Sequence, residues 1–184
     1  MPELEIVAFD GGPIIAIPES TLVSWGGIDS IQPGGEAEAP DSYSPGDEPT
    51  DYDRACAIST WAMLLDVGGE QGLVMDISDE PGPCVAWVPR PYGGVFLGGG
   101  VGDLDAEASV VVLEGLTWVP LSEPLVLNCE ALISTTAAAP GADFLEEDHL
   151  RAAIGPGTYD VSVAESADSW AVGVRLRRRA TGPS

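Results

Sequence analysis

The sequence contains no lysine among its 184 residues. Seven arginines face 30 aspartates and glutamates, which gives a formal net charge of −23 at pH 7. A field of this sign repels nucleic acid and anionic membrane surfaces and attracts basic proteins. We therefore expect neither nucleic acid nor membrane as a partner. The same composition is typical of high-GC or salt-adapted genomes, so acidity alone does not identify what the protein binds.

Long apolar runs are also missing. No run approaches the roughly 20 residues that span a bilayer. The N-terminal segment, MPELE, is acidic where a signal peptide would be basic. We expect a soluble, cytoplasmic protein that forms a single domain over residues 1–184.

Cysteine is scarce as well. Cys56, Cys84 and Cys129 are odd in number and form no CxxC pair or cluster with histidine. This pattern favours small buried hydrophobes in a reducing cytosol over disulfides or a zinc site.

Residue patterns that carry catalysis are equally rare. The one histidine, His149, lies in an acidic segment without a serine or cysteine nucleophile motif, which is typical of a solvated surface residue. The GGGVGD run at residues 98–103 lacks the lysine of a phosphate loop. The acids at 103, 105 and 107 lack the glycine and distant glutamate of a calcium loop. We expect no enzyme activity, no metal and no cofactor.

The chain does contain many short apolar runs separated by glycine and proline, which predicts strands. We expect a mainly β fold (α+β with few short helices), packed as sheets or a sandwich. The runs at 4–9 and 13–17 predict an opening hairpin. Glycine-rich links predict a further hairpin over residues 61–77, although residues 61–65 also fit a continued helix. The other predicted strands cover 84–88, 95–97, 109–113 and 116–119. The arginine-rich residues 175–179 predict an edge strand and tail.

Short helices are predicted over residues 19–25, 51–58 and 144–151. Thr50 or Asp51 is suited to cap the second of these, with Ala55, Cys56 and Ile58 turned inward. Arg54 is expected to pair with Asp51 or Asp53. Residues 29–50, which are acidic and rich in proline and glycine, predict a flexible surface loop.

The two halves of the sequence are similar. Residues 124–134 align with residues 13–24, and residues 154–163 align with residues 67–76. This similarity predicts a degenerate internal duplication with pseudo-repeats over about 1–90 and 115–179.

Two segments carry a recognisable signature, GGPIIAIPESTLVSWGGI at 11–28 and TDYDRACAI at 50–58. Together with DVGGEQGLVMDISDEP, SEPLVLNCEALIS and GPGTYDVSV they resemble the immunity protein 21 family of bacterial polymorphic-toxin systems. The resemblance covers nearly the whole chain apart from residues 29–49 and the tail. It implies a cytosolic antidote that binds and neutralises a cognate toxin by stoichiometric inhibition, without catalysis. An uncharacterised enzyme or a small-ligand-binding β module is the alternative, and either would require a concave pocket.

Local charge density suggests which residues meet a basic toxin. Acids at the end of the 29–50 loop, with a tyrosine as aromatic anchor, form the first hypothesis. The acidic segment before His149 forms the second. The hypothesised toxin-binding residues are Asp47, Glu48, Asp51, Tyr52, Asp53, Glu146, Glu147 and Asp148.

Overall fold

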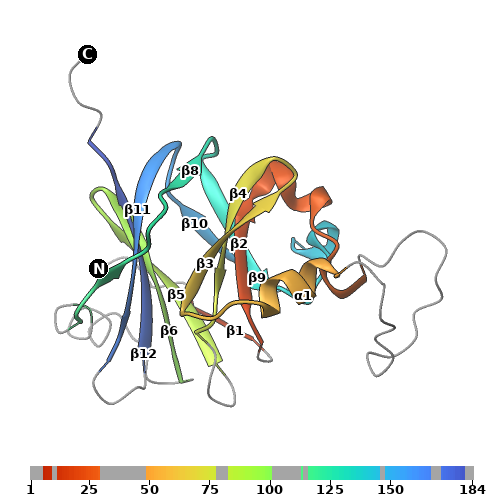
Figure 1. Cartoon of the computed structure of the whole chain (residues 1–184), viewed down its shortest axis with the longest axis horizontal. Coiled ribbons are helices and arrows are strands. Elements are labelled where there is room, and N and C mark those ends of the chain that lie inside the picture. The colour runs from red at the N-terminus through yellow and green to blue at the C-terminus, as the bar shows by residue number, and fades with distance from the viewer. Residues whose placement is uncertain are drawn as a thin grey trace.

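A computed structural model describes residues 6–9, 12–29, 49–77, 83–100, 113, 116–145, 148–166 and 171–180. In this part of the chain two β-sheets pack face to face (Figure 1), which confirms the expected mainly β fold. The predicted flexible loop lies outside the described residues apart from its ends, and so do residues 109–112.

The larger sheet has seven strands in the order β1-β5-β6-β12-β11-β7, and β8 also pairs with β11. All of its pairings are antiparallel. Its strands are β1 (Ile6–Ala8), β5 (Pro83–Arg90), β6 (Gly93–Gly100), β7 (Val119–Pro120), β8 (Leu125–Leu127), β11 (Gly157–Glu165) and β12 (Ala171–Arg178).

The smaller sheet has five strands in the order β10-β9-β2-β4-β3. Its strands are β2 (Ile14–Pro18), β3 (Ala62–Val67), β4 (Glu70–Met75), β9 (Ala131–Thr136) and β10 (Leu150–Ala153). Gly68 and Gly69, with φ of 61° and 85°, close the β3–β4 hairpin, as a two-residue turn with both φ positive requires. The glycine-turn hairpin is therefore confirmed. The opening hairpin is wrong, because β1 pairs in the larger sheet and β2 in the smaller one.

Apolar side chains fill three layers. The main core lies between the sheets. A second cluster covers the outer face of the smaller sheet, and a third cluster covers the outer face of the larger sheet. All five residues of β2 are buried, because Ile14 and Ala16 face the main core while Ile15 and Ile17 face the second cluster. Strands covered on both faces have continuous apolar sequences rather than alternating ones.

Short helices lie around the second cluster, at the outer face of the smaller sheet (Figure 1). They are the 3₁₀ helices η1 (Glu19–Ser24), η2 (Gly27–Asp29) and η3 (Gly141–Asp143), and the α-helix α1 (Asp51–Cys56). The helix predicted over 144–151 is wrong in all of its described residues. Phe144 and Leu145 form a turn after η3, residues 148 and 149 lie in no helix, and β10 begins at Leu150. Leu150 and Ala152 are buried and their neighbours exposed, so pairing with β9 sets the conformation there.

The arginine-rich end of the chain does not form an edge strand, contrary to the prediction. Strand β12 lies between β6 and β11. Val174 and Leu176 point into the main core, and the intervening Arg175 stacks on Trp118 with its guanidinium carbon 4.4 Å from the ring centroid. Alternation therefore lets a strand with several arginines occupy the middle of a sheet.

The strand order can be compared with the predicted internal duplication. In the larger sheet β6 and β12 are neighbours, flanked by β5 and β11 and then by β1 and β7. In the smaller sheet β2 and β9 are neighbours, flanked by β4 and β10. The residue alignment made from sequence is wrong for residues 14–16, because these lie in β2 of the smaller sheet while the aligned Leu125–Leu127 form β8 of the larger sheet. The duplication itself stays a prediction.

Candidate functional site

Helix α1 is fixed at its first turn by hydrogen bonds from its own residues. The Thr50 hydroxyl accepts from the Asp53 N–H (3.0 Å), and the Asp53 carboxylate accepts from the Thr50 N–H (2.8 Å). This capping box confirms Thr50 as the cap. The Asp53 carboxylate is thus used to start the helix.

Asp51 and Arg54 attach α1 to the rest of the fold. The Asp51 carboxylate accepts from the Gly26 N–H (2.8 Å) and from Arg54 Nη1 (2.7 Å). Arg54 Nη2 also donates to the carbonyl of Asp66 in β3 (2.7 Å). The expected Arg54–Asp51 pair is therefore confirmed. Its effect is to hold α1 between the Trp25–Gly26–Gly27 turn and the C-terminal end of β3.

Tyr52 is half-buried against the second cluster. A hydrogen bond with the Cys56 side chain, followed by burial, raises the pKa of the Tyr52 hydroxyl. Cys56 itself is exposed, contrary to the prediction, while Cys84 is buried and Cys129 half-buried. Cys56 occupies the last turn of a six-residue helix, where only Ala55 is buried.

The structure brings together part of the residue set hypothesised to meet a toxin. Asp47, Glu48, Glu146 and Glu147 lie outside the described residues. Of the others, Asp51 and Asp53 have carboxylates engaged in holding α1, and Asp148 is exposed. Ala55 of α1 and Phe144, just ahead of the second acidic segment, both pack into the second cluster. Helix α1 and Phe144 therefore lie at the same face of the smaller sheet.

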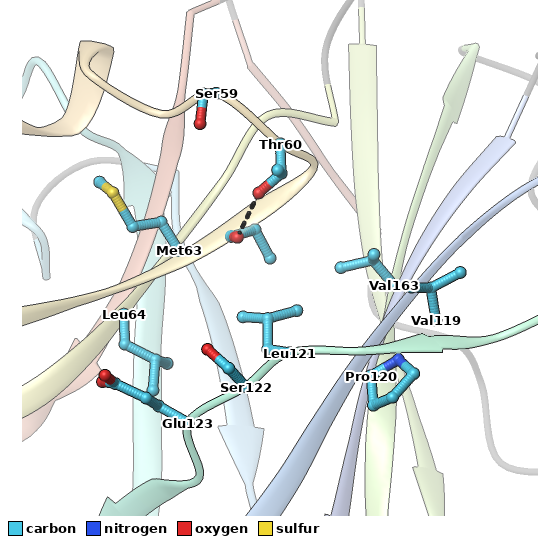
Figure 2. Close-up of a pocket in the computed structure, with 11 residues that line it drawn as sticks. Ser59, Thr60, Met63, Leu64, Val119, Pro120, Leu121, Ser122, Glu123 and Val163 are labelled. Atoms are coloured by element: carbon cyan, nitrogen blue, oxygen red, sulfur yellow. Dashed lines mark hydrogen bonds between the residues drawn. The ribbon is translucent and has the colours of Figure 1, made fainter.

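A groove lies elsewhere, at the open seam between the two sheets (Figure 2). Its volume is about 420 Å³. One wall comes from β3 and the residues before it. The other comes from β7, from the residues that follow it and from Val163 of β11. The lining residues are Ser59, Thr60, Ala62, Met63, Leu64, Val119, Pro120, Leu121, Ser122, Glu123 and Val163.

The lining of this groove is largely apolar. Glu123 is the single charged side chain among the lining residues, and no histidine or cysteine is present. The arrangement can bind apolar groups, but its lining offers no nucleophile paired with a base. Sequence reasoning missed the groove because its walls come from segments about 60 residues apart, and no local pattern shows that they meet.

The described ranges contain neither a cluster of metal-ligand residues nor a membrane-spanning helix. No group of three or more histidine, cysteine, aspartate or glutamate side chains is arranged there to hold a metal ion. No helix in these ranges is both long enough and apolar enough to cross a membrane.

Comparison with known proteins identifies a family. The sequence model of a family described as Immunity protein 21 matches residues 5–170, nearly the whole chain. No curated protein and no solved structure matches the chain.

Proposed function

Because the chain belongs to the immunity protein 21 family, we propose that it binds a cognate protein toxin and neutralises it by stoichiometric inhibition. The toxin is the effector of a polymorphic or contact-dependent system, and the antidote acts on it in the cytoplasm. The family match over residues 5–170 is the observation that carries this proposal.

The position of the signature residues supports binding rather than catalysis. Asp51, Arg54 and Gly26, which belong to the two signature segments, make hydrogen bonds to one another and to β3. Their role is to fix the architecture at the outer face of the smaller sheet. A function of this protein that depends on surface shape and charge, such as inhibition of another protein, is consistent with that role.

Net charge supports a basic toxin. A formal charge of −23 would speed encounter with a positively charged surface and orient the two proteins before contact. In this proposal the acids near the 29–50 loop and before His149 contribute this field. Direct contacts come from side chains not already engaged inside the fold, such as the exposed Asp148.

The test uses the cognate toxin domain, which we expect to be encoded beside this gene. Purified toxin domain is titrated with the full chain, and toxin activity should fall linearly to an end point at one antidote per toxin. An unrelated protein of similar size and negative charge serves as the control for unspecific electrostatic binding. Persistent toxin activity at excess antidote would contradict the proposal. Loss of activity at far less than one equivalent would indicate an enzyme instead.

The groove supports one alternative function, that of a small-ligand-binding module. Its volume of about 420 Å³ falls in the usual range of small-molecule sites, about 300–1,000 Å³. Binding of a small apolar ligand in the groove by a chain that leaves the toxin domain fully active would favour this candidate over the antidote role.

A further inference from the structure

Strand β3 has an open edge in the smaller sheet. It ends the strand order, with β4 on one side and no described strand on the other. At six residues it is longer than the other described edge strands, since β1 and β8 have three residues, β7 two and β10 four. It also lacks proline and lysine, the residues that commonly block strand addition.

The register shows which backbone groups of β3 point away from β4. Partners in an antiparallel pair alternate between hydrogen-bonded and non-hydrogen-bonded positions. The Asp76 N–H donates to the Trp61 carbonyl (3.1 Å), so this alternation continues through residues 63, 65 and 67. The backbone groups of Ala62, Leu64 and Asp66 therefore face outward.

Two side chains already occupy outward-facing carbonyls at the ends of β3. The Thr60 hydroxyl donates to the Ala62 carbonyl (2.8 Å), shown as the dashed line in Figure 2. Arg54 donates to the Asp66 carbonyl (2.7 Å). Between them, the N–H and C=O of Leu64 have no partner among the described residues. These are the groups that an added strand would pair with first.

The apolar groove lies along this edge. Met63 and Leu64 form part of one wall, and they are only half-buried. Val119, on the opposite wall, is 59% exposed. An extended segment pairing with Leu64 would place alternate side chains into the groove, where they would lose contact with water.

Negative charge near both ends of this edge further restricts which kind of segment could pair with β3. Glu123 lines the groove and Asp66 follows at the end of β3, and both are exposed. Arg54, which contacts the end of β3, is held by Asp51 and the Asp66 carbonyl. The edge therefore complements a segment with an apolar centre and lysine or arginine beside it.

We infer that the toxin adds an extended segment to the β3 edge, paired with the backbone of Leu64 and seated in the groove through apolar alternate side chains. This inference rests on the proposed function and names the contact that would carry it. Main-chain pairing supplies affinity in such complexes, and the pockets for alternate side chains supply specificity.

Replacement of Leu64 separates main-chain pairing from side-chain contact. Leu64→Pro removes the outward N–H but leaves the bonds between β3 and β4, since proline is tolerated at an edge position whose N–H faces away from the sheet. Leu64→Ala removes the side chain and keeps the N–H. We expect Leu64→Pro to weaken binding of the neighbouring-gene toxin domain more than about tenfold beyond Leu64→Ala, by the loss of main-chain hydrogen bonds.

Calorimetry of the full-length variants gives the affinities, and circular dichroism checks their folding. Equal weakening by the two variants would overturn strand addition, because a side-chain contact alone would explain it. If the wild-type chain itself neither binds nor inhibits the toxin domain, the proposed function fails. If the wild type inhibits while both variants bind as tightly, only the strand addition fails.

Amide exchange of the wild-type complex tests the same point without a substitution. The Leu64 N–H should exchange at least about a hundredfold more slowly in the complex, while the Leu65 N–H, which already pairs with β4, serves as the internal reference. Unchanged exchange at Leu64 would overturn the inference even if Leu64→Pro failed to fold.

Two further measurements test which molecule binds at the β3 edge. Asp66→Asn combined with Glu123→Gln should slow association several-fold and reduce its salt dependence, and an unchanged rate would overturn the basic flank of the segment. Sedimentation velocity should show a monomer in the absence of toxin. A dimer that Leu64→Pro dissociates would assign the edge to a second copy of this chain and overturn the toxin contact.

Discussion

The backbone N–H of Gly26 donates a hydrogen bond of 2.8 Å to the carboxylate of Asp51. This bond joins the two signature segments of the sequence, which a long acidic stretch separates. The side chain of Asp51 is 16% exposed and also pairs with Arg54. One carboxylate therefore sets the position of α1 relative to η1, η2 and β3.

Removing that carboxylate should destabilise the fold. We expect Asp51→Ala to lower the free energy of unfolding by about 2–3 kcal/mol, because a half-buried N–H and a guanidinium lose a charged acceptor. Asp51→Asn, which keeps one acceptor oxygen, should lower it by less. Urea unfolding at pH 7 measures both.

The pair between Arg179 and Asp160 provides the control for Asp51. Its N–O distance is also 2.7 Å, but the two side chains are 51% and 52% exposed. Asp160→Ala should therefore change the free energy of unfolding by less than about 1 kcal/mol. Equal losses for Asp51→Ala and Asp160→Ala would contradict the structural role assigned to Asp51.

Gly27 allows a close approach between the turn after Trp25 and the segment before η3. Its φ is +58°, and a Cβ at this position would lie 2.4 Å from the Ala138 carbonyl oxygen. Gly27→Ala should lower the free energy of unfolding by about 2–5 kcal/mol, through backbone strain and a steric clash together. The shift in urea midpoint measures this loss.

A substitution at Gly69 serves as the control that separates backbone strain from steric clash. Its φ is +85°, but a Cβ there would meet nothing within 4 Å. Gly69→Ala should therefore show only the backbone strain, about 1–2 kcal/mol. A loss as large as that of Gly27→Ala would show that contact with residue 138 contributes nothing.

Local patterns predicted the mainly β fold, the β3–β4 hairpin, the Thr50 cap and the Arg54–Asp51 pair. Each of these depends on residues close in sequence. The wrong predictions concern long-range pairing. Leu150 and Ala152 follow an acidic, helix-like segment, yet they join β9 because their side chains complete the core between the sheets.

The candidate site, too, was only partly predictable from the sequence. The acidic segments could be found from composition, but not that the Asp51 carboxylate also accepts from the distant N–H of Gly26. The open edge of β3 could not be found either. Whether a strand is central or at an edge depends on which distant segments pair with it, and β3 contains no proline that would mark it as an edge.

Trp118 and Arg175 form a second contact that can be measured as a pair. The guanidinium carbon lies 4.4 Å from the ring centroid, and burial, followed by the charge of Arg177, lowers the pKa of Arg175. A double-mutant cycle with Trp118→Ala and Arg175→Met should give a coupling of about 0.5–1 kcal/mol in thermal unfolding. Additive effects of the two substitutions would contradict a cation–π contribution.

The environment of Tyr52 gives an expectation for alkaline pH. Its pKa is raised in the folded protein, first by the hydrogen bond with Cys56 and then by burial. An unfolded tyrosine titrates near pH 10. Because the folded pKa is the higher one, the stability that neutral Tyr52 contributes is fully present below about pH 10 and is lost as pH rises through the folded pKa.

Phenylalanine at position 52 should therefore flatten part of this pH dependence. The difference in unfolding free energy between wild type and Tyr52→Phe should be constant from pH 7 to about pH 9.5 and should shrink above about pH 10. Cys56→Ala removes the largest cause and should bring the folded pKa of Tyr52 closer to that of a free tyrosine, so the loss should still begin near pH 10 but be smaller in total. Tyr159, whose pKa burial also raises, is retained in all three proteins and so cancels in the comparison. A difference between wild type and Tyr52→Phe that stays constant up to pH 11 would show that Tyr52 titrates alike in the folded and unfolded chains.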